Sequence, residues 1–278
     1  SWKRAMREMF GSKLDSSKMG KRTKSAVALI SNAIAEKRLD LAEEANNLAE
    51  KVLTATGVKV KASDRAGADK GSAATEYLIF IANREVEQLA DIAIAAFDEG
   101  KDPSKLKKEV AAVFHGKQAI DIACFGRMLA DAPDLNTDAS AQVAHAFSID
   151  QITPEYDYFT AVDDCASDDN AGAAMIDTVG FNSSTLYRYA TLNVDALRDQ
   201  LQDADAMVEG VSAFVEAFVK SMPSGKQNTF ANHTLPEDIV IVLRDSQPIS
   251  AADAFENPIK RKDGISVSRQ GIERLGDR

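Results

Sequence analysis

The chain has 278 residues, which is long enough for one large domain or two smaller ones with buried cores. Its hydrophobic fraction of 45% and charged fraction of 27% are typical of a globular protein, and its longest apolar runs are too short to span a membrane. A net charge of −10 argues against a surface that binds polyanions everywhere. Two cysteines, Cys124 and Cys165, and no signal-peptide pattern favour the reducing cytoplasm.

The first 24 residues depart from this acidic average. They hold eight Lys or Arg against two acids, a local balance of +6. Residues 1–10 predict a short helix with Lys3 and Arg7 on one face, and residues 11–24 predict a loop. Because the chain opens on Ser1 and enters this helix at once, we expect further residues upstream.

Helical periodicity dominates residues 25–115. One apolar period runs from Ser25 to a stop at Gly57, and residues 57–72 predict a mobile connection. A second helix is expected from about Thr75 to Phe97, and a third from Ser104 to Phe114. The sequence therefore predicts that residues 25–115 form a mostly helical insertion.

Strand-like sequence follows. Residues 118–127 alternate like a strand, residues 139–148 fit either helix or strand, and residues 149–180 predict a long hairpin. From Ser148 to Gly180 there are eight Asp or Glu and no Lys or Arg, while Tyr156, Tyr158 and Phe159 bring three rings. Such a hairpin cannot hold phosphate by charge, but its rings can stack on bases.

The last hundred residues mix both kinds of structure. Residues 181–192 are β-rich, residues 195–221 predict one long amphipathic helix, and residues 239–243 predict a buried strand. The whole pattern indicates the α+β class, with the helical block inserted between sheet elements.

Several candidate sites have two readings. Lys3 and Arg7 fit a solvated surface helix or a phosphate contact. Arg127 could pair with phosphate and Met128 could lie beside a base, yet Met128 could equally fill core. The loop that carries Lys226 is a connecting turn or a phosphate contact, and its spacing is not that of a Walker motif.

Other patterns do not support a site. Asp163, Asp164, Asp168, Asp169 and Asn170 lack the glycine and the closing glutamate of a calcium loop. Ser183 and Ser184 lack the flanking glycines of a hydrolase nucleophile.

Several segments, in order along nearly the whole chain, resemble the CasC family, the backbone subunit of the type I-E CRISPR Cascade complex. They are SWKRAMR from Ser1, DIACFGRM from Asp121, FTAVDD from Phe159, FNSSTLYRYATLNV from Phe181, PSGKQNTFA from Pro223 and RDSQPISAADAFE from Arg244. Together these segments are highly specific, although no single one would suffice.

The resemblance implies a protein shaped like a right hand. Its palm is a modified RRM-like, ferredoxin-like sheet, its fingers are helical and its thumb is a long β-hairpin. On this basis we expect residues 1–10, 118–148 and 181–278 to form the palm, residues 11–117 the fingers and residues 149–180 the thumb. The family's first palm strand and basic loop precede the position of Ser1, and the family continues beyond Arg278.

The resemblance also implies RNA contacts by matching position. Lys3 and Arg7 fall at backbone contacts, Met128 falls where a methionine packs on bases, and Tyr158, Phe159 and Thr160 fall at the thumb wedge. The full set of expected RNA-binding residues is Lys3, Arg4, Arg7, Arg127, Met128, Tyr158, Phe159, Thr160, Lys226 and Gln227.

The implied function is a non-catalytic, cofactor-free scaffold. Copies of it would polymerise along CRISPR RNA beside other Cascade subunits, with target DNA read by pairing to the guide and no membrane involved. The alternative is a metal-dependent ribonuclease that uses Asp134, Asp138 or the hairpin carboxylates. A structural assembly protein without nucleic acid is a third possibility.

Overall fold

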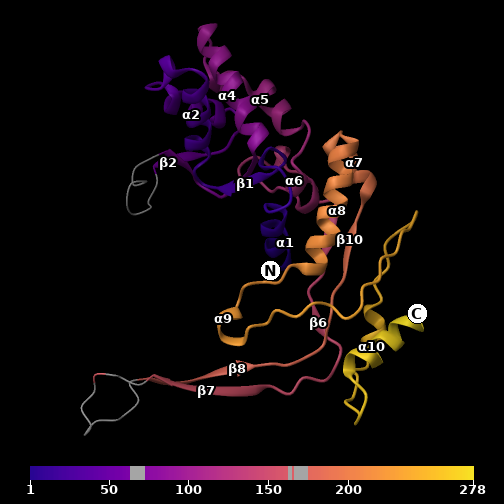
Figure 1. Cartoon of the computed structure of the whole chain (residues 1–278). Helices are drawn as coiled ribbons and strands as arrows, with labels where there is room; N and C mark the ends of the chain where they lie inside the picture. The colour runs from indigo at the N-terminus through magenta and orange to yellow at the C-terminus, as the bar shows by residue number, and fades with distance from the viewer. Residues whose placement is uncertain (63–72, 162–164, 166–174) are drawn as a thin grey trace. The chain divides into compact units, whose positions relative to one another are not determined.

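The computed structural model describes residues 1–62, 73–161, 165 and 175–278. It confirms the α+β class, with helices and small antiparallel sheets in both of its compact units (Figure 1). The first unit comprises Ser1–Val143 and Ala190–Leu235, and the second comprises Ala144–Tyr189 and Pro236–Arg278. Each unit is described by itself.

Helices make up most of the first unit. Its α-helices are α1 (Trp2–Phe10), α2 (Ala26–Lys37), α3 (Ala45–Thr54), α4 (Asn83–Asp98), α5 (Lys107–Phe114), α6 (Ile120–Phe125), α7 (Val194–Leu201), α8 (Ala204–Lys220) and α9 (Gln227–Phe230). Short 3-10 turns lie at Ser16–Lys18, Leu39–Leu41, Pro103–Lys105 and Pro133–Leu135.

The strands of the first unit pair two by two. β1 (Gly20–Thr23) pairs with β4 (Ile79–Ala82), β2 (Val60–Ala62) with β3 (Ala73–Thr75), and β5 (Ala141–Val143) with β10 (Ala190–Leu192). One core packs α2, α3, α4 and α5 together, and a second packs α1, α6, α7 and α8. The second core holds α1, and β1 pairs with β4, whose Ile79 and Ile81 lie in the first core.

The second unit contains the hairpin. β7 (Glu155–Ala161) pairs with β8 (Met175–Phe181), β6 (Phe147–Ser148) pairs with β9 (Leu186–Tyr187), and α10 (Val267–Gly276) lies near the end of the chain (Figure 1). A 3-10 turn lies at Ala252–Phe255. Its small core contains Ile149, Phe255 and Ile259.

The hairpin prediction is confirmed, and the uncertain residues 139–148 prove to hold the short strands β5 and β6. Several helix boundaries were wrong. The predicted loop at residues 11–24 contains β1, the period from Ser25 is split into α2 and α3, and α5 begins at Lys107 after a 3-10 turn. The expected helix from Thr75 begins only at Asn83, because residues 73–82 hold β3 and β4.

Two strand predictions were also wrong. Residues 120–125 form the helix α6 rather than a strand. Five of its six residues are buried, so the helix has no polar face and its sequence shows no helical period. Residues 239–243 are exposed and form no strand, since no neighbouring strand pairs with them in the described part of the chain.

The predicted helix at 195–221 is interrupted. Gln202 adopts a left-handed conformation with φ 49°, and Asp203 then caps α8 by accepting a hydrogen bond from the Ala206 N–H at 3.0 Å. No described helix is long and apolar enough to cross a membrane.

Candidate nucleic-acid interface

Helix α1 presents a cationic face. Its apolar face buries Ala5, Met6 and Phe10, so Lys3 and Arg4 are left exposed. Arg4 Nε lies 2.8 Å from Glu8 Oε1 in an exposed pair, which water and salt screen. Lys3 has no carboxylate partner within the described ranges, so its ammonium is available to an anion.

Arg7 behaves differently from Lys3 although both lie on the same face. Its Nε lies 2.9 Å from Asp121 Oδ2, and it donates a hydrogen bond to the Gly20 carbonyl at 3.2 Å. Its guanidinium carbon lies 4.4 Å from the centre of the Phe80 ring. Burial raises the pKa of Asp121, and the Arg7 guanidinium opposes that shift. Arg7 therefore joins α1 to β1 and α6.

Strand β1 adds two cations that the sequence analysis did not single out. Lys21 and Arg22 are both exposed on this strand, and successive residues of a strand point to opposite faces. The Arg22 guanidinium carbon lies 5.1 Å from the centre of the Phe80 ring, which Arg7 also contacts. The only sequence signal for this strand was the charge balance of residues 1–24.

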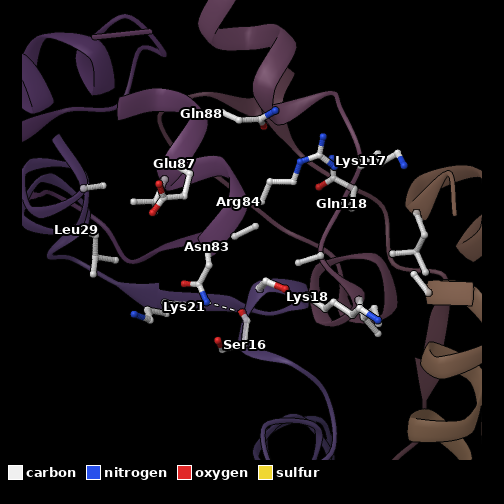
Figure 2. A pocket seen from close by; sticks show the side chains of 18 of the residues that line it. Ser16, Lys18, Lys21, Leu29, Asn83, Arg84, Glu87, Gln88, Lys117 and Gln118 are labelled. Carbon is white, nitrogen blue, oxygen red and sulfur yellow. Dashed lines mark hydrogen bonds between the residues drawn. The ribbon is translucent and has the colours of Figure 1, made fainter. Parts of the chain in front are cut away.

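Lys21 also faces a broad pocket of about 800 Å³ at the start of α4. Figure 2 shows four basic side chains around it, from Lys18, Lys21, Arg84 and Lys117. Lys18 pairs with Glu209 at 2.5 Å and Lys117 lies 4.0 Å from Asp203, so part of this charge is already neutralised.

Arg127 is fully buried. Its Nη1 lies 2.6 Å from Glu85 Oε1, and the two side chains are 0% and 1% exposed. Burial raises the pKa of Glu85, and the Arg127 guanidinium opposes that shift. This position argues against a direct contact between Arg127 and phosphate, and Arg127 is left out of the interface proposed below.

Met128, the next residue, is 78% exposed. Gly126 precedes this turn with φ 78°, and a Cβ there would lie 3.0 Å from the Thr137 carbonyl oxygen. Leu129 follows with 2% exposure and donates its N–H to Asn136 Oδ1 at 2.7 Å. The structure thus places Met128 at the surface between buried neighbours and not in the core.

The β7–β8 register divides the hairpin into two unlike faces. Tyr158 pairs with Thr178 and Phe159 with Asp177, so the two rings point to opposite sides of the ribbon. The uncharged face consists of Tyr156, Tyr158, Thr160, Ile176, Thr178 and Gly180. The acidic face consists of Glu155, Asp157, Phe159, Ala161, Met175, Asp177, Val179 and Phe181. Tyr158 is 63% exposed and Phe159 is 41% exposed.

Lys226 and Gln227 lie where α9 begins. Lys226 is exposed in a left-handed conformation with φ 61°, and its carbonyl accepts the Phe230 N–H at 2.9 Å. Gln227 is half-buried and donates from Nε2 to the Pro223 carbonyl at 3.1 Å. Of this pair, the Lys226 ammonium is the group free to meet an anion.

A metal centre finds little support in the described residues. Among them, no three His, Cys, Asp or Glu side chains lie close enough together to hold a metal ion. The acidic run at Asp163, Asp164, Asp168 and Asp169 lies outside the described residues.

Comparison with known proteins gives a consistent result. The family model described as "CT1975-like protein" matches residues 1–278. A chain of a structure described as "CRISPR RNA-guided surveillance complex, pre-nicking" is 29% identical with a TM-score of 0.77, and the match covers 100% of this chain and 76% of that one. A chain described as "CRISPR RNA-guided surveillance complex" is 25% identical with a TM-score of 0.66, covering 99% and 73%. No curated protein sequence matches.

Proposed function

Since the chain belongs to the CT1975-like protein family, we propose that it is a CRISPR RNA-binding backbone subunit of a Cascade surveillance complex. This proposal rests on the similarity of the chain, over its whole length, to chains of CRISPR RNA-guided surveillance complexes. Within that class, the segments that resemble CasC favour the type I-E form. Its partners would be the guide RNA, target DNA through the guide, further copies of itself and other Cascade subunits, in the cytoplasm.

Affinity for RNA would come from cations that the protein does not use internally. Lys3 on α1, Lys21 and Arg22 on β1, and Lys226 before α9 are exposed and can contact phosphates. Arg4 can join them because its exposed pair with Glu8 is weak. Contacts of this kind weaken as the salt concentration rises.

The hairpin would separate bases without holding phosphates. Because Tyr158 and Phe159 point to opposite faces, a ribbon inserted between two nucleotides can offer a ring to the base on each side. Thr160 lies on the face of Tyr158. Met128, exposed in the other unit, would place a polarisable thioether against a base.

We keep the hand-like division as part of this proposal. Residues 149–180 would be the thumb, residues 11–117 the fingers and the remaining segments a modified RRM-like palm. The long β7–β8 pair supports the thumb, and the helical core of α2, α3, α4 and α5 supports the fingers.

Co-expression tests the proposal directly. The full-length protein, produced with companion Cascade subunits and a spacer transcript, should co-purify with short RNAs of uniform length and a high 260/280 absorbance ratio. Purification of the assembled proteins without that transcript would refute RNA binding and favour a purely structural role.

The ribonuclease alternative has its own test. Purified complexes are incubated with labelled RNA and magnesium, in the wild-type and in Asp134→Asn and Asp138→Asn variants. We expect intact RNA in every case, because the proposed role is to hold the guide. Magnesium-dependent cleavage that either substitution removes would favour the nuclease.

A further inference from the structure

The residue before Met128, Arg127, belongs to a buried polar cluster of the first unit. Arg127 makes four side-chain contacts: Nη1 pairs with Glu85 at 2.6 Å, and Nη2 donates to the Phe114 carbonyl at 3.0 Å, to Gln118 Oε1 at 3.2 Å and to Thr137 Oγ1 at 3.2 Å. Its guanidinium carbon also lies 4.9 Å from the centre of the Phe114 ring. Few other side chains could replace this planar, multiply donating group.

The backbone around Arg127 is fixed as well. Its N–H donates to the Thr137 carbonyl at 2.9 Å, and its own carbonyl accepts the Thr137 N–H at 3.0 Å. Glu85 Oε2 meanwhile accepts the Ala82 N–H at 2.8 Å, which fixes the carboxylate to the start of α4. The turn that carries Met128 is therefore held to α4 through one ion pair.

Only the side chain of Met128 leaves this fixed base. A methionine has three rotatable bonds, and ordering it on binding costs conformational entropy. A mobile turn beneath it would add to that cost, whereas a fixed turn limits the loss to the side chain itself.

We infer that the buried Glu85–Arg127 pair is a positioning device that holds Met128 in the direction needed to contact a displaced base. Arg127 is then a positioning residue that acts through Met128, and not a phosphate contact. This inference rests on the proposed RNA-binding function and identifies what holds the base-contacting residue in place.

A double-mutant cycle tests the inference. Complete complexes are assembled from four proteins: wild type, Arg127→Lys, Met128→Ala and the double variant. The guide RNA carries one 2-aminopurine, which is placed at each guide position in turn. Fluorescence reports unstacking of the labelled base, and filter binding reports overall affinity. A Lys cannot reproduce the four-way contacts of Arg127, so the charge is kept while the geometry is lost.

We expect each single variant to lower the fluorescence gain at the displaced position by about fivefold, the size of one lost contact between a thioether and an aromatic ring. The double variant should be no worse than Met128→Ala alone, because Arg127 has nothing left to position. The RNA affinity measured by filter binding should change by much less than the fluorescence gain does. Arg38→Lys, an arginine paired with Asp40 and Asp98 away from this turn, is the matched control and should match wild type.

Two results would overturn the inference. Wild-type fluorescence in Arg127→Lys would show that the pair does not position Met128, and fully additive losses would show that it acts independently. If Arg127→Lys does not fold, Thr137→Ala removes one acceptor while the backbone bridge remains, and the same cycle is run with it. A wild-type complex without RNA would refute the proposed function as well, whereas additive losses in an RNA-bound complex refute the inference alone.

Discussion

Arg7 lies where α1, β1 and α6 meet, and it contacts a group from each neighbour. Sequence periodicity places it beside Lys3, and resemblance assigns both to RNA. The structure distinguishes them, because Arg7 is paired with a carboxylate that is 0% exposed while Lys3 has no such partner among the described residues. Two cations on one helix face can thus have different roles.

This difference gives a prediction about stability. Arg7→Ala should lower the free energy of unfolding by about 3 kcal/mol, because it leaves the Asp121 carboxylate buried without its partner. Lys3→Ala should change it by less than about 0.5 kcal/mol and should lower RNA affinity instead. Urea unfolding of the two variants beside wild type checks both values. Equal stability of the two variants would contradict the assignment.

Asp121 gives a prediction about pH. Burial raises the pKa of Asp121 above its ordinary value of 3.8, so the folded state binds its proton more tightly than the unfolded state does. Its contribution to stability is therefore fully present below pH 3.8 and is lost as the pH rises through the raised pKa. Asp121→Asn cannot titrate, so over that interval the variant should gain stability relative to wild type.

Urea unfolding at a series of pH values from about 3.5 to about 7 measures this difference. Asn47→Ala, which removes no titratable group from the exposed face of α3, is the control and should keep a constant offset from wild type. A constant offset for Asp121→Asn as well would show that the buried carboxylate does not titrate differently in the folded state.

At the scale of elements, the hairpin was the most predictable part of the chain. Its aromatic and β-branched residues alternate over two runs, so local pattern was sufficient. The register was not predictable, because it depends on which residues pair across the two strands. That register decides that Tyr158 and Phe159 point apart and that Glu155, Asp157 and Asp177 share one face.

The opposite faces predict how two substitutions combine. Tyr158→Ala and Phe159→Ala should each weaken guide-target duplex formation by about tenfold, because each removes one ring from one base. The double variant should lose about a hundredfold, because contacts on separate faces add. Tyr77→Ala, an exposed tyrosine of the first unit, is the control. Electrophoretic titration of target DNA measures all four, and a double variant no weaker than a single would contradict the two-sided wedge.

Other elements could not be read locally, for physical reasons. Helix α6 is buried on nearly every side, so its apolar residues follow no helical period, and its Asp121 is explained only by Arg7 and Gly20, which are distant in sequence. Residues 239–243 have a strand-like sequence, but a strand also needs a partner. Likewise, the sequence does not tell which of Arg127 and Met128 is exposed. Long-range packing decides that the Arg127 guanidinium is buried and the Met128 thioether is exposed.

For the whole molecule, charge placement matters more than net charge. The chain carries 33 basic and 43 acidic residues, so indiscriminate binding to polyanions is disfavoured. Exposed cations on α1 and β1 nevertheless gather in the first unit, while the described hairpin strands carry only acids among their charged residues. In the proposed function, this distribution assigns phosphate contacts to the cations of α1 and β1 and leaves base contacts to the uncharged groups of the hairpin.

Salt dependence tests this distribution. Each phosphate contact with a single strand contributes about 0.7 to the slope of log affinity against log salt. If Lys3, Lys21 and Arg22 each hold one phosphate, the triple alanine variant should flatten the slope by about 2 units per subunit. Titration of the assembled complex with guide RNA across a salt series measures the slope. Lys37→Ala removes a cation that is held between two carboxylates, Glu87 at 2.9 Å and Asp91 at 2.6 Å, and it should leave the slope unchanged. An unchanged slope in the triple variant would place the phosphate contacts elsewhere on the chain.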